Sequence, residues 1–304
     1  MSVVLMYHAV HAAGDLSRIA PEDRPYAVDA EAFARQLDAV AARLAREPAR
    51  DADDGAGPGA GGAGGEGERA PAVAITFDDG HASNVDIALP MLLERGLAGL
   101  FFVTADWVGA REHYVDADML AGLARAGMSV GAHGATHRFF DDLPEAEARA
   151  ELIRSRRTLE SAVGAPVRSM SFPGGRHDGA ARRLAREAGL GALFDSRVAT
   201  VAPAALAPAL ALAAHGSAPG TTSGPGSDVP GPGSPGSAPS GVGAPPVPRV
   251  AVRHDTDDTT FARMIDPDPA WYAAARRGER VRGLARRVLG NRIYHGLYKS
   301  LRAG

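Results

Sequence analysis

Two histidines and two aspartates in this sequence are suited to bind and use a metal ion. His133 and His137 stand four residues apart, so both imidazoles can reach one ion from a single loop or helical turn. Such a pair also occurs on ordinary surface helices, and the prediction therefore depends on Asp78 and Asp79, which follow a short apolar run. Two imidazoles and one carboxylate leave coordination positions open for water and substrate, as catalytic zinc and iron sites require.

The adjacent aspartates are costly to place together unless a cation or hydrogen bonds compensate their charges. Successive residues at the end of a strand point in different directions, so one carboxylate can bind the metal while the other reaches a bound water molecule. The alternative is a solvated acidic turn, because Asp-Asp-Gly is also common in loops. The strand-like run Ile75, Thr76 and Phe77 before the pair argues against that alternative.

The elements that must position these side chains alternate between strand and helix along the chain. Such alternation predicts parallel strands joined by helical crossovers, and we expect an α/β fold, a distorted parallel (β/α) barrel. In parallel sheets the functional loops lie at the carboxyl ends of the strands. Four polar groups follow predicted strands in this way and should converge on one face: His8, Asp78-Asp79, His133 to His137, and the loop at Pro173.

Glycine and proline are concentrated in two segments. The 304 residues include 37 Gly and 22 Pro, whereas the hydrophobic fraction, 45%, is ordinary for a globular protein. Residues 51–70 contain no large apolar side chain, and residues 201–248 contain no Lys, Arg or aromatic residue. Both are expected to form disordered Gly/Pro/Ala-rich insertions. The predicted organisation is a catalytic domain over 1–265 and a basic amphipathic helical extension over 266–304.

Composition also limits the partners and the location. The absence of cysteine excludes a disulfide scaffold, a thiolate zinc site and a cysteine nucleophile. A net charge of −3 gives no reason to expect a nucleic-acid partner. No apolar run reaches the ~18 residues that span a membrane, and the N-terminus lacks signal-peptide features, so we expect a cytoplasmic protein. Residues 276–302, rich in Lys and Arg, either lie on an anionic membrane surface, which makes the protein peripheral to the membrane, or pack on the barrel.

Three motifs resemble those of a known family. They are Thr-Phe-Asp-Asp-Gly at residues 76–80, the histidine pair described above, and Ser-Phe-Pro-Gly-Gly at residues 171–175. In that order they are similar to motifs one to three of the polysaccharide deacetylases, also called carbohydrate esterase family four or the NodB-homology domain. The resemblance extends over residues 1–200 and 249–265. It implies a distorted (β/α) barrel that removes N-acetyl groups from an N-acetylated glycan.

The resemblance also implies a role for each matching residue. Asp78 would be the general base. The ligands of the metal would be Asp79, His133 and His137. The metal is usually Zn²⁺, although these ligands also suit Co²⁺, Ni²⁺ and Fe²⁺. The loop at Pro173 would contact the substrate, and the backbone N–H of Gly174 would stabilise the oxyanion.

The sequence also departs from the family pattern. Ser171 holds the position of the motif-three arginine, so the contact that orients the base is missing or comes from elsewhere. The fourth and fifth motifs, the last of which usually supplies the general acid, have no clear copy. Leu-Met-Tyr-His-Ala-Val at residues 5–10 instead resembles the poly-N-acetylglucosamine deacetylase-like subgroup, in which a histidine on an N-terminal strand takes that role. We therefore expect His8 to be the general acid, with His254 as the alternative.

These observations predict a metal-dependent hydrolase that removes N-acetyl groups from a sugar of a poly- or oligosaccharide or of a lipid-linked glycan precursor. Two alternatives stay open: a catalytically weak member that binds glycan, and a metal-dependent amidase or O-acetyl esterase that uses the same site on a non-polymeric substrate. A glycoside hydrolase is not favoured, because no pair of carboxylates suited to stand about 5–10 Å apart across a sugar stands out beside the metal motifs. The sequence leaves the glycan, the metal and the oligomeric state open.

Overall fold

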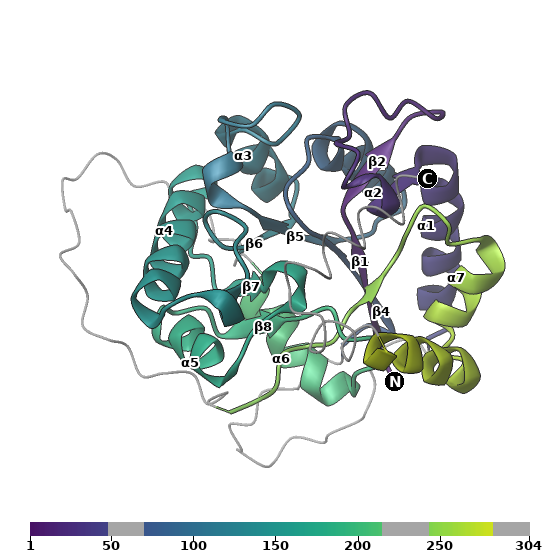
Figure 1. Cartoon of the computed structure of the whole chain (residues 1–304). Coiled ribbons are helices and arrows are strands. Elements are labelled where there is room, and N and C mark those ends of the chain that lie inside the picture. The colour runs from purple at the N-terminus through teal and green to yellow at the C-terminus, as the bar shows by residue number, and fades with distance from the viewer. Residues whose placement is uncertain (48–69, 215–242, 282–304) are drawn as a thin grey trace, which may run out of the picture.

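A computed structural model of the chain describes residues 1–47, 70–214 and 243–281. At its centre is a curled sheet of seven parallel strands in the order β8-β7-β6-β5-β4-β1-β9 (Figure 1). These strands are β1 (Val3–Tyr7), β4 (Val73–Phe77), β5 (Gly99–Val103), β6 (Ser129–Ala132), β7 (Ser169–Ser171), β8 (Ala192–Phe194) and β9 (Val250–Ala251). Two short parallel strands, β2 (Ala9–His11) and β3 (Ala27–Asp29), form a separate pair.

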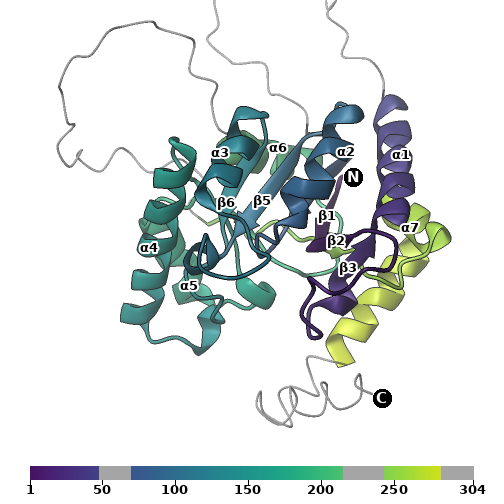
Figure 2. The same ribbon diagram turned by 90° about the horizontal axis from the view of Figure 1, so that it is seen from above.

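Helices surround the strands in both views (Figures 1 and 2). They are α1 (Ala30–Ala45), α2 (Leu89–Glu94), α3 (Ala117–Arg125), α4 (Glu145–Val163), α5 (Gly179–Glu187), α6 (Pro203–Ala213) and α7 (Asp258–Ile265). Short helical turns lie at η1 (Arg24–Tyr26), η2 (Asn84–Ala88), η3 (Ala105–Trp107), η4 (Phe140–Asp142) and η5 (Pro173–Gly175). Four of the helices begin after an aspartate whose carboxylate accepts a backbone N–H of the first turn, a preferred N-cap: Asp29, Asp116, Asp178 and Asp257.

Residues 247–251 join the two edges of the curled sheet. Val247 exchanges backbone hydrogen bonds with the end of β8, donating to Leu193 at 2.8 Å and accepting from Asp195 at 3.0 Å. Three residues later, Val250 pairs with Leu5 of β1. One irregular segment therefore bridges β8 and β1, which explains why the barrel is distorted. The expected parallel (β/α) barrel is confirmed, and β9 is its last strand in the described part of the chain.

The strands are buried on both faces, and each face packs into a different apolar cluster. Alternate residues of a strand point to opposite faces, so Phe101 joins the cluster between sheet and helices, whereas Leu100 and Phe102 join an inner cluster. The inner cluster also contains Val4 of β1 and Phe194 of β8. Strands that are enclosed in this way read as continuous apolar runs in the sequence.

The prediction of a disordered insertion over 201–248 is wrong for the part that the structure describes. Residues 203–213 form α6, in which Leu206 is 0% exposed and packs into the inner cluster. Val201 exchanges two backbone hydrogen bonds with Ser2, at 2.8 and 2.9 Å. The prediction of disorder was based on the lack of charged and aromatic residues. Alanine favours helix, however, and a few leucines are enough to bury one face of it. Residues 215–242 lie outside the described part.

The other insertion and the C-terminal extension are described only in part. Of residues 51–70, only Ala70 is described, and it is buried. Residues 269–281 form a helix beside α7 (Figure 1). Tyr272 of this helix is buried and donates its hydroxyl to the carbonyl of Met264 at 3.0 Å. The predicted membrane-binding stretch 276–302 lies mostly outside the described residues. In the part of the chain that is described, no helix has the length and apolarity to cross a membrane.

A leucine substitution in α6 tests whether this helix contributes to the fold. Leu206→Ala should lower the free energy of unfolding by about 2–5 kcal/mol, because it leaves a cavity in the inner cluster. Denaturant unfolding measures the loss, and Leu210→Ala, at a half-buried position of the same helix, serves as the matched control with a smaller loss. Equal small losses in both variants would contradict the packing of α6.

Candidate metal centre and its neighbouring ion pair

The expected convergence of polar residues at the carboxyl ends of the strands is present. Tyr7 of β1 pairs with Phe77 of β4, and the backbone N–H of Asp78 continues this ladder by donating to the carbonyl of Tyr7 at 2.9 Å. His8 and Asp78 therefore leave neighbouring strands at the same level. His133 follows β6 in the same way, since its N–H donates to the carbonyl of Val103 at 2.9 Å.

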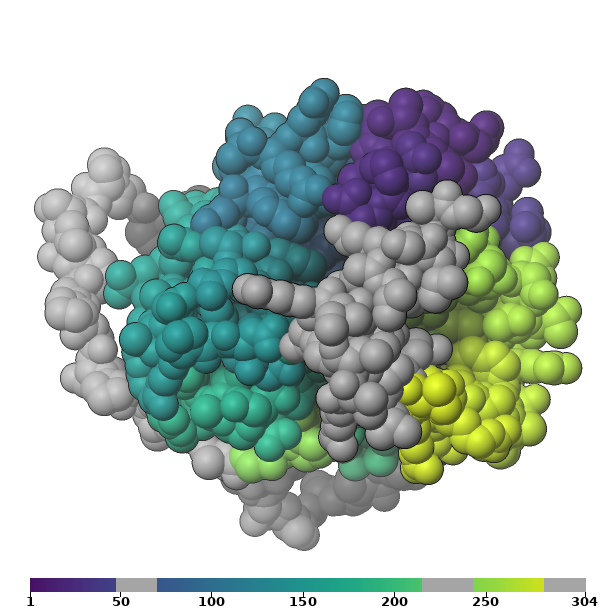
Figure 3. Space-filling model, viewed as in Figure 1, coloured from purple at the N-terminus to yellow at the C-terminus, as the bar shows by residue number. Residues whose placement is uncertain are grey.

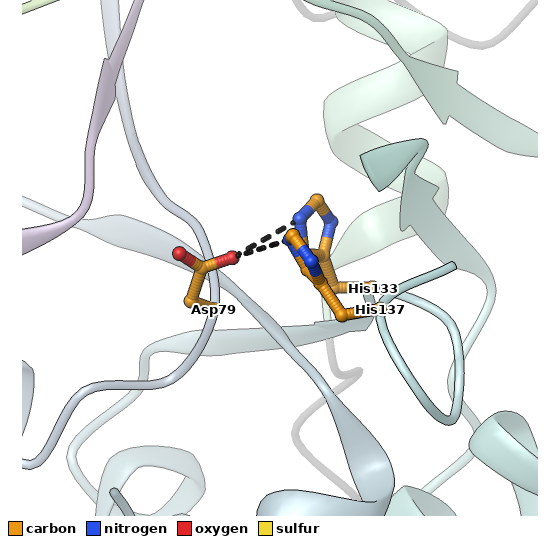
Figure 4. A group of neighbouring side chains, drawn as sticks. All are labelled: Asp79, His133 and His137. Atoms are coloured by element: carbon orange, nitrogen blue, oxygen red, sulfur yellow. Dashed lines mark ion pairs between the residues drawn. The ribbon is translucent and has the colours of Figure 1, made fainter. Parts of the chain in front are cut away.

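Asp79, His133 and His137 form one compact group. Oδ1 of Asp79 lies 3.3 Å from Nε2 of His133 and 3.2 Å from Nε2 of His137. Figure 4 shows the carboxylate facing both rings from the opposite loop. Among the described residues this is the one group whose ligand atoms could hold a metal ion, all of them within 4.8 Å of one another. The three residues that the sequence predicted as ligands are thus brought together.

The orientation of the His133 ring fits a cation at this position. Its Nδ1 lies 2.9 Å from the carbonyl oxygen of Ser171, which can only accept, so Nδ1 donates to that oxygen and Nε2 is the nitrogen turned toward Asp79. Oδ1 of Asp79, which Nε2 faces, is a buried atom without a hydrogen-bond partner in the described structure. A cation between the two atoms would bind to both. The donor set of two imidazoles and one carboxylate suits a divalent metal, with the Ser171 carbonyl fixing the imidazole.

Two of the three residues of this group have left-handed backbone conformations, which are uncommon outside glycine. The φ angle is 73° at Asp79 and 63° at His137. A non-glycine residue in this region costs on the order of 1–2 kcal/mol, and such residues collect at functional sites. At Asp79 the twist separates the two adjacent carboxylates, so that Asp79 faces the histidines while Asp78 turns toward a different cation.

A buried glutamate holds the loop that carries the histidines. Glu151 of α4 is 5% exposed, and its carboxylate accepts three hydrogen bonds of 2.8 Å. The donors are the backbone N–H of Ala135, the backbone N–H of Thr136 and the Thr136 hydroxyl. A carboxylate that satisfies two backbone donors fixes the loop between His133 and His137. Glu151 could not be identified from the sequence, because it is one of several acidic residues in a polar helix and nothing in the pattern marks it as buried.

Arg249 forms a buried two-point ion pair with Asp78. Nη1 lies 2.6 Å from Oδ1 and Nη2 lies 2.7 Å from Oδ2. Arg249 is 0% exposed and Asp78 is 3% exposed. Burial alone would raise the pKa of Asp78, but the charges of Arg249 and His133 and the hydrogen bonds from Arg249 outweigh it and leave that pKa below its ordinary value. Asp78 is therefore ionised at neutral pH.

Arg249 uses its remaining donors to link several strands. Nε donates to the backbone carbonyl of Asp195 at 3.1 Å, and Nη1 donates to Oγ1 of Thr76 at 3.0 Å. Nη2 also donates to Oγ of Ser171, which in turn donates to Oδ2 of Asp78 at 3.2 Å. The contact expected from an arginine at position 171 thus comes from a residue far away in the chain. The one signal in the sequence was a lone arginine directly before the apolar run 250–252.

The two candidate acids occupy different environments. His8 is half-buried, and its ring lies 4.8 Å from that of Tyr26. Burial lowers the pKa of His8, while the charges of Asp79 and Asp78 act in the opposite direction, which places it within electrostatic reach of the metal group. His254 is exposed, and its Nδ1 donates to the carbonyl of Pro25 at 3.2 Å. The surroundings favour His8 over His254.

The loop at Pro173 borders the histidine loop. A Cβ atom at Gly134 would lie 3.7 Å from Cγ of Pro173, so the two turns are neighbours. Gly174 has a φ of 60°, and a Cβ atom there would lie 2.9 Å from the ring of Phe139. Both the backbone and the space therefore require glycine at position 174. The structure thus places Pro173 and Gly174 beside the group that the sequence predicted.

Comparison with known proteins supports the fold, and part of the chain matches one family model. The sequence model of the family described as polysaccharide deacetylase matches residues 65–193. YxkH of Bacillus subtilis (strain 168), whose name places it among polysaccharide deacetylases, is 26% identical over 117 residues, which are 38% of this chain and 42% of YxkH. The chain thus spans less than half the length of this curated relative.

Solved structures resemble the fold at low sequence identity. IcaB from Ammonifex degensii is 20% identical with a TM-score of 0.54, over 89% of this chain and 96% of IcaB. A polysaccharide deacetylase from Bacillus cereus is 17% identical with a TM-score of 0.57, over 87% of this chain and 68% of that one. A de-N-acetylase from Aggregatibacter actinomycetemcomitans is 14% identical with a TM-score of 0.53, over 86% and 99% of the two chains.

Removing Arg249 should expose the cost of burying Asp78 alone. Arg249→Met is expected to lower the free energy of unfolding by roughly 3–5 kcal/mol at neutral pH, because Asp78 keeps a buried unpaired charge. Without the cation, burial raises the pKa of Asp78, so the loss should shrink as the pH falls and the carboxyl binds a proton. In the wild type, by contrast, the free energy of unfolding should fall as the pH drops below ~4. The pKa of Asp78 is lower in the folded protein than in the unfolded chain, so acid favours the unfolded chain.

The double variant Arg249→Met with Asp78→Asn supplies the control for this ion pair. It removes both charges and should recover part of the lost stability, measured by denaturant unfolding across pH. If the double variant were as unstable as the sum of the two single variants, the two residues would not be coupled.

Glu151 should affect metal affinity without touching the metal. Glu151→Gln keeps the size of the side chain but places an amide against backbone donors, which should loosen the histidine loop and weaken metal binding by about 10- to 100-fold. Competition with a chromophoric chelator measures the affinity. Glu147→Gln is the matched control, because Glu147 lies on the same helix but pairs with the exposed Arg138. Equal affinities in the two variants would refute this role.

Proposed function

We propose that this chain is a metal-dependent hydrolase that removes acetyl groups from the nitrogen of an N-acetylated sugar, because residues 65–193 match the sequence model of the polysaccharide deacetylases and the fold resembles that of solved deacetylases. The sugar would belong to an oligo- or polysaccharide or to a lipid-linked glycan precursor. The observation that carries the proposal is the pairing of two aspartates with two different cations: Asp79 with the histidine group and Asp78 with Arg249.

A divalent metal bound by Asp79, His133 and His137 would acidify a water molecule and polarise the acetamide carbonyl. Asp78 accepts the proton that this water loses as it attacks the carbonyl carbon. Arg249 keeps Asp78 ionised and fixes its orientation, so that the carboxylate is ready as a base at neutral pH. Its bonds to both oxygens leave Asp78 little freedom to turn away.

Two further groups complete the reaction. The backbone N–H of Gly174 donates to the oxygen that becomes negative during attack, for which the turn at Pro173 provides the position. His8 donates a proton to the nitrogen, because an amine leaves poorly without one. The C–N bond then breaks, giving acetate and a free amino sugar. An O-acetyl ester could be cleaved by the same groups, since its leaving oxygen has less need of the acid.

Acetate release from N-acetylated chitooligosaccharides tests the proposal directly. The zinc-loaded full chain should release acetate, and treatment with a chelator should abolish the release. Asp78→Asn should lower kcat by about 10²- to 10⁴-fold, because it removes proton transfer from the attacking water, and His8→Ala should have a comparable effect. His254→Ala is the matched control and should keep near-normal turnover.

Metal content measured on each variant separates loss of chemistry from loss of the site. Normal turnover in His8→Ala with zinc bound would refute the role of His8 alone. If the metal-loaded protein bound several N-acetylated glycans and released no acetate from any of them, it would be a glycan-binding protein and the proposed activity would be wrong.

A further inference from the structure

One side of the metal group is covered by two loops that come from distant parts of the chain. The first carries Asp23, directly before η1, and the second begins with η3, which ends at Trp107, and continues to Tyr114. The ring of Trp107 stacks on His137 with centroids 5.2 Å apart, and Tyr114 packs against Trp107 at 4.8 Å. The wall formed by these loops therefore begins at the most exposed metal ligand, whose side chain is 30% exposed.

Backbone hydrogen bonds hold this wall rigidly against the turn that carries the aspartates. Val115 donates to the carbonyl of Gly80 at 2.9 Å, and Ala82 donates to the carbonyl of His113 at 2.8 Å. The hydroxyl of Tyr114 then donates to Oδ2 of Asp23 at 3.3 Å and joins the second loop to the first. Figure 3 shows the N-terminal segment (purple) meeting the segment near residue 110 (blue) at the surface.

Two charged side chains of this wall have unused hydrogen-bonding capacity. The guanidinium of Arg111 lies 4.2 Å from the ring centre of Trp107 and 4.3 Å from that of Tyr114, which fixes its place. Throughout residues 1–47, 70–214 and 243–281, neither a hydrogen bond nor an ion pair uses its N–H groups. The carboxylate of Asp23 has only the Tyr114 hydroxyl as a partner in the same ranges.

Asp23 lies close enough to the metal group to sense its charge. Burial raises the pKa of Asp23, and the negative charge of Asp79 raises it further, while Arg111 acts in the opposite direction. The charge of Asp23 in turn contributes to raising the pKa of His137, although burial of that imidazole acts against it. Asp23, Arg111 and the metal ligands therefore share one electrostatic environment.

We propose that Asp23 and Arg111 bind hydroxyl groups of the sugar whose acetamide is hydrolysed, and thereby select a neutral hexosamine with free hydroxyls on the His137 side. This inference rests on the proposed function. A carboxylate accepts and a guanidinium donates charge-assisted hydrogen bonds, and neighbouring sugar hydroxyls offer both partners. The two charges balance each other, so this wall does not attract an anionic group, as Arg111 alone would. A sugar with acylated hydroxyls would leave both charges without partners.

Kinetics on two kinds of substrate test the subsite. Asp23→Asn and Arg111→Gln should each lower kcat/KM for N-acetylated chitooligosaccharides by about 10- to 100-fold, mainly through KM. Both variants should keep wild-type rates on 4-nitrophenyl acetate, which has no sugar hydroxyls, together with wild-type zinc affinity. Arg35→Gln is the matched control, because Arg35 is exposed on α1 and pairs with Asp258 of α7, outside the two loops. It should match the wild type on both substrates.

Three results would overturn the subsite. Equal losses on both substrates would mean that the residues act on the geometry of the metal group. Weaker zinc binding in the variants would mean the same. If Arg111→Gln lowered kcat/KM only for uronate-containing oligosaccharides, the wall would bind an anionic sugar.

Failure of the proposed function would look different. If the wild type released no acetate from any glycan, saturation-transfer NMR with the same chitooligosaccharides would still report binding. Binding to the wild type that is lost in Asp23→Asn would support the subsite without the activity. Equal binding to both proteins would refute the subsite.

Discussion

The buried ion pair between Arg249 and Asp78 is the interaction on which the site and the barrel both depend. Arg249 lies on the irregular segment that joins β8 to β1, and its donors reach Asp78 after β4, Ser171 of β7 and the carbonyl of Asp195 after β8. A buried carboxylate without this partner would be neutral or strongly destabilising. The residue that keeps Asp78 charged is thus also the one that links β8 to the strands on the other side of the barrel.

This arrangement explains how a buried aspartate and a half-buried one can be adjacent. Like charges on neighbouring residues repel, and burial strengthens the repulsion. The left-handed backbone at Asp79 turns the two carboxylates apart. Asp78 binds a fixed guanidinium inside the barrel, whereas Asp79 faces the histidines at the rim. The fold itself therefore neutralises Asp78 and leaves Asp79 open to another partner.

The sequence was most informative where local pattern determines structure. The apolar runs before His8, Asp78 and His133 predicted the strands, and parallel topology then predicted that these residues converge. Arg249 could not be assigned, because its pairing with Asp78 joins residues 171 positions apart and no local pattern encodes such a contact. The helix α6 was missed for the opposite reason: its composition resembles a linker, and only the inner cluster shows why its leucines are buried.

The positive φ angles at Asp79 and His137 carry a consequence for how this protein can change over time. Glycine adopts that conformation without strain, so a glycine at either position would relieve the backbone while removing one of the three side chains of the proposed metal site. A population of variants selected only for thermal stability would therefore accumulate glycine at positions 79 and 137. Its members would lack the proposed metal site without having lost the fold. Descendants without these side chains need not be damaged proteins, because their loss is also a route to a more relaxed backbone.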